Sequence, residues 1–489
     1  MQRVILTRAP NSDGIPINQE GRCQYPVTIG FHSLMPPLSS LYVASLLTQA
    51  GHTVKIIDCQ AKWAERRPFI DAILEWGATV VGFQTGMFSV ADDVSIAKEI
   101  KTRNPGITTV FFDEYATAIH TELATFNGID IVVRGDPEIA FVDIASRKNI
   151  HEISGITFNH NGTIIVNPDG HRPNLDDLPL PALELVNTMD YLHWETGRPY
   201  TLLQISRGCP SQCTFCTAPL YYGSQVRYRS AKSIIVEIED RIERFKIRDF
   251  NFYADTFTLN KKLTTEICSE IISRGIHINF WANSRVDTID EEILYLLKQS
   301  GCSLIGFGLE SGDMESLKLM KKGITLEQSR KAIELCRKCG IQSAAFMMIG
   351  FPWETKEQMK KTYEFANAID PDWVQFATYV PFPGTQMTKE FQDKNLILSN
   401  NPYDSYTLSM VTTEHETAQS IKKMAIWSFI RFYSKPHRII RYLRRKGRIR
   451  LVKAILSYFV YRLFSKSPLR TAKAVAIGLE KTGGTSDLG

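Results

Sequence analysis

The chain has 489 residues, of which 44% are apolar and 22% charged, as in a soluble globular protein with two or three domains. Its net charge of +5 is uneven, because residues 421–453 hold twelve Lys and Arg and no acidic residue. No apolar run reaches the roughly 18–20 residues of a membrane-spanning helix, and Met1–Arg8 reads as a strand rather than a signal peptide. We therefore expect a cytoplasmic protein whose nine cysteines do not form a disulfide framework.

Residues 1–150 alternate short β-type runs with amphipathic helical patterns. This alternation predicts a doubly wound parallel sheet, in which ligands bind at the carboxyl ends of the strands. The expected strands are Arg3–Arg8, Thr53–Asp58, Thr79–Gln84, Thr108–Phe112 and Ile129–Arg134, with helices near Leu38–Gln49, Arg67–Trp76 and Ala91–Thr102.

The first expected helix opens at the Pro-Pro-Leu run at 36–38, contains Tyr42 and ends before Gly51-His52. This pattern is similar to the cobalamin-binding domain that precedes the catalytic domain in one large subgroup of radical S-adenosylmethionine (SAM) enzymes. Val81–Phe83 and Val133–Gly135 also resemble that subgroup. The resemblance implies that cobalamin binds at the carboxyl edge of this sheet.

Two loops depart from the cobalamin-binding pattern. The loop that begins at Asp58-Cys59-Gln60 has no histidine to serve as a lower axial ligand, although many members of the subgroup also lack one. The stretch Phe112–Tyr115 stands where the subgroup usually has Gly-Gly-Pro-His, and bulky residues replace glycines that allow close ligand approach. A domain that keeps the fold and has lost the cofactor is therefore the alternative to a cobalamin-binding domain.

A hairpin over Gly155–Asn167 and a proline-bearing connector lead to an apolar run, Leu202–Ile205, and then to three cysteines spaced C-x3-C-x2-C. Thiolates suit iron–sulfur clusters or zinc, but a structural zinc site needs four ligands and this loop offers three. Three thiolates hold three irons of a [4Fe–4S] cube and leave the fourth open. An open coordination position is typical of a catalytic centre.

Cys209, Cys213 and Cys216, with Phe215 before the last of them, resemble the signature loop of radical SAM enzymes. The resemblance implies that the three cysteines hold a [4Fe–4S] cluster whose open iron binds SAM. An external one-electron reductant would then allow SAM cleavage to a 5′-deoxyadenosyl radical, which abstracts hydrogen from the substrate.

Residues 201–390 show six strand patterns alternating with helical patterns, which predicts a partial (β/α)6 TIM-type barrel. Barrel chemistry belongs at the carboxyl ends of the strands, and the cysteine loop follows the first strand. The expected strands are Leu202–Ser206, Asp249–Asp255, Ile278–Arg285, Leu304–Ser311, Ala344–Gly350 and Trp373–Val380.

Polar residues at these strand ends resemble family contacts with SAM. Asp255 would pair with the SAM ammonium group, and Arg285 would pair with the SAM carboxylate. The resemblance places further cofactor contacts at Phe215, Asn283, Glu310, Ser311 and Gly350.

The other cysteines are expected to be structural. Cys336 and Cys339 lie in a helical pattern without a second pair, and Cys268 and Cys302 read as core residues. Only two cysteines lie in the first 150 residues, which is too few for the second three-cysteine cluster of methylthiotransferases.

The basic region has aromatic residues between its Lys and Arg residues over 415–470. We expect helices that cap the open barrel. A peripheral membrane contact is a second interpretation, since cationic amphipathic helices bind anionic interfaces, and nucleic-acid binding is a weaker third.

We therefore predict a cobalamin-dependent radical SAM methyltransferase that acts on an unactivated carbon of a small-molecule or lipid-like substrate. The alternative is a radical SAM enzyme that does not bind cobalamin and catalyses a rearrangement, dehydration or oxidation. A third hypothesis is a metal-stabilised binding protein. The expected regions are a cobalamin-binding-like domain at 1–150, a hairpin and linker at 151–200, the barrel at 201–390 and a basic helical region at 391–489.

Overall fold

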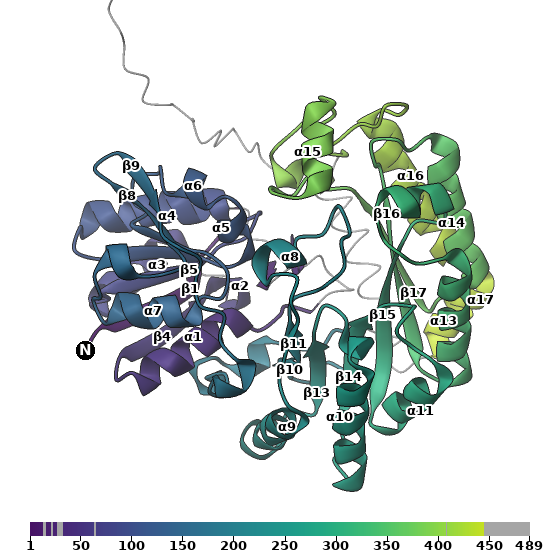
Figure 1. The fold of residues 1–489 in the computed structure, drawn as a ribbon, viewed down its shortest axis with the longest axis horizontal. Coiled ribbons are helices and arrows are strands. Elements are labelled where there is room, and N and C mark those ends of the chain that lie inside the picture. The colour runs from purple at the N-terminus through teal and green to yellow at the C-terminus, as the bar shows by residue number, and fades with distance from the viewer. Residues whose placement is uncertain (13–15, 21–22, 27–32, 63–64, 407, 445–489) are drawn as a thin grey trace, which may run out of the picture.

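The computed structural model describes residues 1–12, 16–20, 23–26, 33–62, 65–406 and 408–444. Within them, two mainly parallel β-sheets stand side by side, each covered by helices (Figure 1). The first sheet comes from the first third of the chain and the second from the middle. The predicted doubly wound sheet followed by a six-stranded partial barrel is confirmed.

The first sheet has the strand order β4-β1-β5-β6-β7-β8-β9. The first five strands in that order are parallel, whereas β8 and β9 form a hairpin that pairs antiparallel with β7. The hairpin expected in the connecting region therefore extends the first sheet. The strands are β1 Arg3–Arg8, β4 Thr53–Asp58, β5 Val80–Gln84, β6 Thr108–Phe112, β7 Ile131–Val133, β8 Ile156–His160 and β9 Thr163–Val166.

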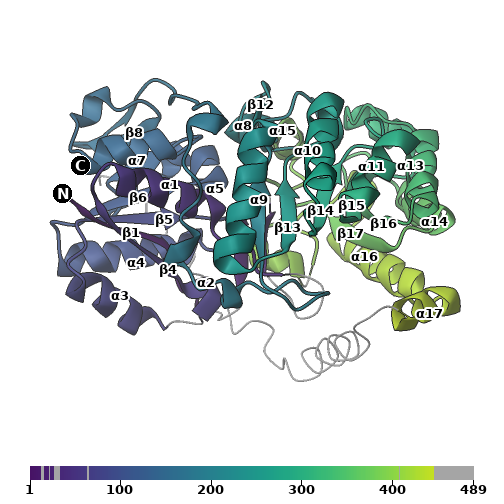
Figure 2. The ribbon, with the colours of Figure 1, turned by 90° about the horizontal axis from the view of Figure 1, so that it is seen from below.

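Helices cover both faces of the first sheet (Figure 2). Because side chains alternate along a strand, Leu6 and Phe112 pack toward α1 and α7, whereas Phe83 and Phe111 pack toward α3 and α4. The helices are α1 Leu38–Gln49, α2 Cys59–Lys62, α3 Arg66–Glu75, α4 Val90–Arg103, α5 Glu114–Ala118, α6 His120–Leu123 and α7 Glu138–Ala145. A separate antiparallel ribbon, β2 Ile17–Glu20 with β3 Cys23–Pro26, follows β1.

The second sheet has the order β10-β13-β14-β15-β16-β17, and every neighbouring pair is parallel. Successive strands are joined by helices on one side, so the sheet curves as an open barrel (Figures 1 and 2). The strands are β10 Tyr200–Gln204, β13 Asp249–Tyr253, β14 Asn279–Ser284, β15 Cys302–Glu310, β16 Gln342–Ile349 and β17 Trp373–Thr378. The joining helices are α9 Ala231–Phe245, α10 Lys261–Ser273, α11 Glu291–Gln299, α12 Met314–Leu319, α13 Leu326–Lys338 and α14 Lys356–Ile369.

The last strand of the open barrel, β17, would leave backbone groups unpaired at its outer edge. The Tyr433 hydroxyl lies against this edge, donating to the Val374 carbonyl at 2.9 Å and accepting from the Val374 N–H at 3.0 Å. Tyr433 ends α16 (Ala418–Tyr433), which is followed by α17 (Pro436–Arg444), while α15 (Gln386–Asp393) lies further upstream. The expected helical cap is thus present over the described residues, and 445–489 lie outside them.

Gly82 provides a test of how closely the first sheet is packed. A Cβ atom at Gly82 would lie 2.8 Å from the Phe141 ring and 2.9 Å from a Leu6 methyl group. We expect Gly82→Ala to lower the free energy of unfolding by about 1–3 kcal/mol, because both neighbours are buried and have little room to move. Urea denaturation followed by fluorescence measures this. Gly106→Ala, on an exposed loop, is the control, and an equal effect in both variants would contradict the packing argument.

Candidate active site

The carboxyl edges of the two sheets face each other. Arg207, after β10, contacts Asp136, after β7, and Tyr115, after β6, packs against Phe382, after β17, with ring centroids 5.5 Å apart. The ribbon strand β2 lies between the edges, since the Tyr253 hydroxyl at the end of β13 donates to its last carbonyl at 3.3 Å. Ligand sites of parallel sheets and barrels lie at these edges, so the interface is the candidate active site.

The cysteine loop starts from β11 (Ser206–Arg207), which pairs antiparallel with β12 (Arg227–Tyr228). Gly208 has φ +99°, and a Cβ atom there would lie 2.5 Å from the Gln225 carbonyl oxygen, so only glycine fits. The Cys209 N–H donates to the Gly223 carbonyl at 3.2 Å, and the Thr214 N–H donates to the Met320 carbonyl at 3.0 Å. The loop is therefore fixed at both ends by backbone hydrogen bonds.

Three thiol groups project from this loop. Cys209 is buried, and Cys213 and Cys216 are half-buried. Among the described residues, no three or more His, Cys, Asp or Glu side chains are grouped so as to hold a single metal ion. Three thiolates are the ligands that an iron–sulfur cluster takes. Burial raises the pKa of the Cys213 thiol, while Lys322 and Arg285 oppose this shift by stabilising the thiolate. The donor set fits an iron–sulfur cluster.

Lys322 is a functional candidate that the sequence analysis missed. It is almost fully buried, its Nζ pairs with Glu310 Oε1 at 2.8 Å, and it lies 5.8 Å from the centre of the Phe215 ring. Lys322 therefore lies between Glu310, a predicted SAM contact, and Phe215 of the cysteine loop, and it supplies a positive charge there. It comes from the turn after α12, outside any strand end, and no periodic pattern marks it.

Glu354 fixes the turn that carries Gly350. Its Oε2 accepts hydrogen bonds from the Gly350 N–H at 2.7 Å and the Phe351 N–H at 3.1 Å, and Gly350 has φ +93°. Burial raises the pKa of Glu354 to about 8 despite these bonds. Phe351 in turn packs against Phe215, so the Gly350 turn and the cysteine loop are neighbours.

The remaining predicted contacts are less uniform. Arg285 already binds Asp287 through two nitrogen atoms, at 2.9 and 2.8 Å, and its Nη1 lies 3.3 Å from the Ser211 hydroxyl of the cysteine loop. The buried Ser311 hydroxyl contacts Thr362 of α14 at 3.1 Å, away from the loop. Asp255 and Asn283 are partly buried at the ends of β13 and β14. The SAM-binding roles of all these residues remain predictions.

The four cysteines downstream of the loop occupy the core, as expected. Cys268, Cys302 and Cys336 are 1% exposed or less, and Cys339 is 6% exposed. All four belong to one hydrophobic cluster, so the loop cysteines are the metal-binding candidates of the second domain.

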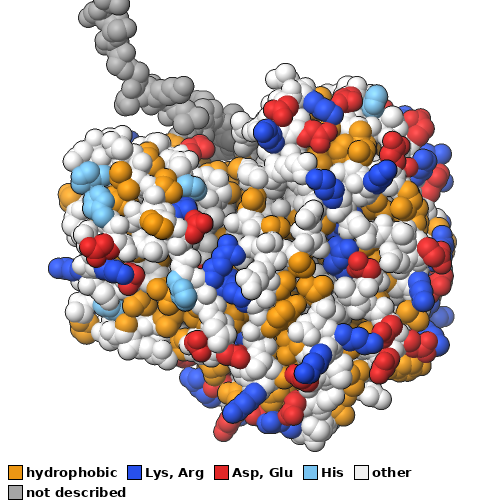
Figure 3. Space-filling model, in the orientation of Figure 1, with side chains coloured by type: hydrophobic (Ala, Val, Ile, Leu, Met, Phe, Trp, Pro, Cys, Tyr) orange, Lys and Arg blue, Asp and Glu red, His pale blue; other side chains and the backbone are white. Residues whose placement is uncertain are grey.

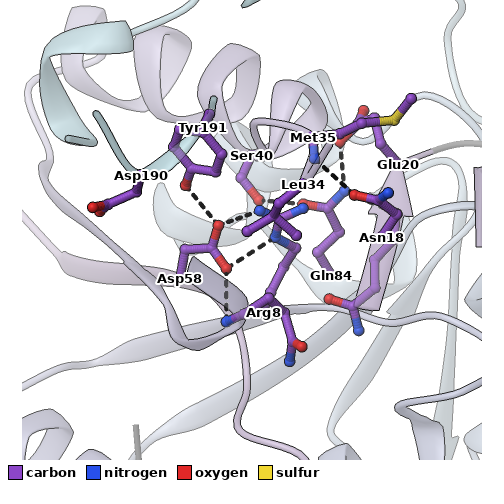
Figure 4. A network of polar contacts seen from close by, with 12 residues as sticks. Arg8, Asn18, Glu20, Leu34, Met35, Ser40, Asp58, Gln84, Asp190 and Tyr191 are labelled. Atoms are coloured by element: carbon purple, nitrogen blue, oxygen red, sulfur yellow. Dashed lines mark hydrogen bonds and ion pairs between the residues drawn. The ribbon is translucent and has the colours of Figure 1, made fainter. Parts of the chain in front are cut away.

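A polar network covers the carboxyl edge of the first sheet (Figure 4). At its centre, Gln84 Nε2 donates to Glu20 Oε2 at 2.8 Å and to Asp113 Oδ2 at 2.7 Å, and its Oε1 accepts from the Ser40 hydroxyl at 2.9 Å. Glu20 Oε1 accepts from the Ser39 N–H in the first turn of α1 at 3.0 Å. Carboxylates favour helix N-termini, so Glu20 ties β2 to the edge of the sheet.

Asp113 keeps the backbone shape of the glycine that it replaces in the family pattern. Its φ of +88° and ψ of −173° lie in a region that glycine favours. The side chain is fully buried and held by Gln84 and by the Glu114 N–H at 2.9 Å. The loop therefore keeps a glycine-type backbone conformation at position 113, and the Asp113 carboxylate occupies the space that a glycine would leave open.

The edge has polar groups for a ligand but no histidine from the loop after β4. Gln60 in that loop is used by the Ile17 N–H, and Cys59 is buried. Gln19 of β2 is fully buried, and neither polar atom of its amide has a partner among the described residues. The Gln19 amide, close to the carboxyl edges of both sheets, fits a polar ligand such as a corrinoid. The loop after β4 would supply no axial histidine to that ligand.

Comparison with known proteins supports this division of the site. Residues 203–366 match the radical SAM superfamily, and residues 26–145 match the B12 binding domain. The uncharacterized methyltransferase PH0819 of Pyrococcus horikoshii is 32% identical over 83% of this chain and 89% of its own length. The chain belongs to the radical SAM superfamily, among the members with a B12 binding domain. It is therefore an enzyme, and a [4Fe–4S] cluster, SAM and cobalamin are the cofactors of its two domains.

Two further similarities are more distant. The anaerobic magnesium-protoporphyrin IX monomethyl ester cyclase of Rubrivivax gelatinosus is 26% identical over 76% of this chain and 69% of its own length. The structure of the radical SAM methyltransferase TsrM of Kitasatospora setae superposes with a TM-score of 0.64 and 19% identity, covering 81% of this chain and 76% of that one. This second match shows that the fold extends over both domains.

The acid pair at the edge predicts a pH dependence of stability. Burial and repulsion by Asp113 raise the pKa of Glu20 to about 8, and burial raises the pKa of Asp113 to about 6. The folded protein therefore holds protons that the unfolded chain releases, so stability is highest below the unfolded pKa values and falls as the pH rises toward 8. We expect Asp113→Asn to be stabilised relative to wild type by about 1–3 kcal/mol more at pH 8 than at pH 5.

Urea denaturation of the cofactor-free protein at the two pH values measures this difference. A hydrogen bond lost because the amide replaces the carboxyl group lowers the free energy of unfolding of the variant equally at both pH values. This loss therefore cancels when the difference at pH 5 is subtracted from the difference at pH 8. Glu75→Gln, at an exposed position, is the control. A difference between wild type and Asp113→Asn that does not change with pH would show that the buried acids are not coupled to folding.

Proposed function

We propose that the enzyme transfers a methyl group to an unactivated carbon of a small, largely apolar molecule. The observation that carries this proposal is the direct opposition of the two carboxyl edges, with the cysteine loop on one side and the B12-domain edge on the other. The name of the Pyrococcus relative as a methyltransferase supports it.

In this proposal, Cys209, Cys213 and Cys216 hold the cluster, and Lys322 with Glu310 lies beside it. The bound cofactors supply a 5′-deoxyadenosyl radical and a transferable methyl group. Lys322 and Arg285 place positive charge near Cys213, which stabilises its thiolate form. An external one-electron donor would have to reach the cluster that these thiolates hold. Tyr115 and Phe382 pack together at the interface, where a radical would need protection from water.

Anaerobic purification from cells supplied with cobalamin, followed by iron reconstitution and assay with SAM and a reductant, tests the proposal. We expect one corrinoid per chain, and both 5′-deoxyadenosine and S-adenosylhomocysteine as products. Cys213→Ala should lose the cluster and both products while keeping the corrinoid. A cluster with 5′-deoxyadenosine but no corrinoid would overturn methyl transfer.

A second function is favoured by the network around Gln84. In the structure, Glu20 and Asp113 fill the edge where the corrinoid is expected, and no histidine replaces the missing axial ligand in the loop after β4. A radical SAM enzyme that runs a rearrangement, dehydration or oxidation in place of methyl transfer is the second candidate, and the cyclase relative is named for a reaction other than methylation. Such an enzyme would yield 5′-deoxyadenosine without S-adenosylhomocysteine.

A proposal for the substrate class comes from α16 and α17, the last two helices of the described residues. The described helices include none that is long and apolar enough to cross a bilayer. However, α16 and α17 lie together on one side of the barrel (Figure 2) and expose large apolar side chains beside basic ones. The exposed apolar residues are Trp427, Phe429, Ile430, Ile439, Ile440 and Leu443. We infer a peripheral contact with anionic membrane and a lipid-like substrate drawn from it.

Vesicle binding tests this contact. We expect the protein to sediment with vesicles of phosphatidylcholine and phosphatidylglycerol, but weakly with phosphatidylcholine alone, because the helices are basic. Ile440→Asp should reduce binding at least about fivefold by placing a charge in the apolar surface. Ile272→Asp, on the exposed surface of α10, is the matched control, and equal losses in both variants would contradict the assignment.

A further inference from the structure

The cysteine loop begins at an arginine that the proposed chemistry does not use. Arg207 directly precedes Gly208 and Cys209, and it is 2% exposed. A guanidinium group cannot lose its charge in a protein, so its burial requires paired acids. Both acids come from the other domain: Nη1 lies 2.6 Å from Asp136 Oδ1, and Nη2 lies 2.6 Å from Glu138 Oε1.

Asp136 pairs with both strands of β11–β12, the antiparallel pair from which the cysteine loop starts. Its second oxygen, Oδ2, lies 2.6 Å from Nη2 of Arg227. Arg207 and Arg227 are directly opposite each other in the β11–β12 pair. One carboxylate of the first domain therefore bridges the two strands. Arg207, Asp136 and Glu138 are buried, and Arg227 is partly buried beside them.

Aromatic rings close the remaining sides of this group. The Arg207 guanidinium carbon lies 5.4 Å from the ring centre of Tyr42 in α1 and 5.5 Å from that of Tyr222. Tyr42 belongs to the first domain, whereas Tyr222 follows α8 (Ala218–Tyr221) in the second. The guanidinium plane is thus held by ion pairs and by rings from both domains, which leaves it little freedom to turn.

We propose that Arg207 is a positioning residue through which the first domain fixes the cluster. Two peptide bonds separate Arg207 from the first cluster ligand. Gly208, between them, packs against the Gln225 carbonyl so closely that a Cβ atom would not fit, and the Cys209 N–H donates to the Gly223 carbonyl at 3.2 Å, so the short segment is held by its neighbours. Movement of Arg207 therefore moves Cys209. The inference rests on the cluster itself and not on methyl transfer.

Arg207→Lys tests this role, because lysine keeps the charge but cannot bind two carboxylates in a fork. Arg241→Lys is the matched control: Arg241 is 1% exposed and pairs with Glu237 and Asp240 in α9, away from the loop. After anaerobic reconstitution, the rate of iron transfer to a ferrous chelator and the electron paramagnetic resonance spectrum of the reduced cluster, with and without SAM, are recorded for both.

We expect Arg207→Lys to release iron at least about fivefold faster than wild type and to change the spectrum, whereas Arg241→Lys keeps both. If Arg207→Lys does not fold, Glu138→Gln replaces it, with Glu237→Gln as its control. This pair removes one charge and keeps an oxygen that accepts from the arginine. Equal iron release and identical spectra in a test variant and its control would overturn the proposal.

Discussion

The structure depends on a buried set of charges that joins its two domains. Arg207 meets Asp136 and Glu138 out of contact with water, with the partly buried Arg227 beside them, and breaking a buried ion pair by removing one partner costs about 3–5 kcal/mol. A hydrophobic contact would hold the domains together as well, but it would tolerate sliding. Charged hydrogen bonds have fixed directions, and at this interface direction is useful because the cysteine loop begins at Arg207.

Several features at the interface oppose stability in the same small volume. Asp113 adopts a glycine-type backbone, Glu20 and Asp113 are buried near each other, and the Gln19 amide has no partner among the described residues. Each costs free energy that the surrounding sheet and helices offset. Strain and unpaired polar groups concentrate at functional sites, and here they lie where two ligand-binding edges meet.

The strands and helices could be predicted from the sequence because their positions follow from the periodic pattern of apolar residues. β1, β4 and α1 were predicted to the residue, and both ends of each of the six barrel strands within two residues, since buried parallel strands are continuous apolar runs. The cysteine loop was visible from spacing alone. Lys322 and the pairing of Arg207 were not, because they depend on which loops meet in space, and no local pattern encodes that. The attachment of the β8–β9 hairpin to β7 was missed for the same reason.

The two departures from the cobalamin pattern have a common physical explanation. Asp113 fills the space above β6 because Gln84 and the Glu114 N–H provide hydrogen bonds for its carboxylate. β2 reaches this position through Glu20, which caps α1 where an anionic ligand group would otherwise bind. Protein groups thus satisfy the N–H donors at this edge of the sheet. The raised pKa of Glu20 makes its burial there more costly as the pH rises, because the ionised form gains most from water.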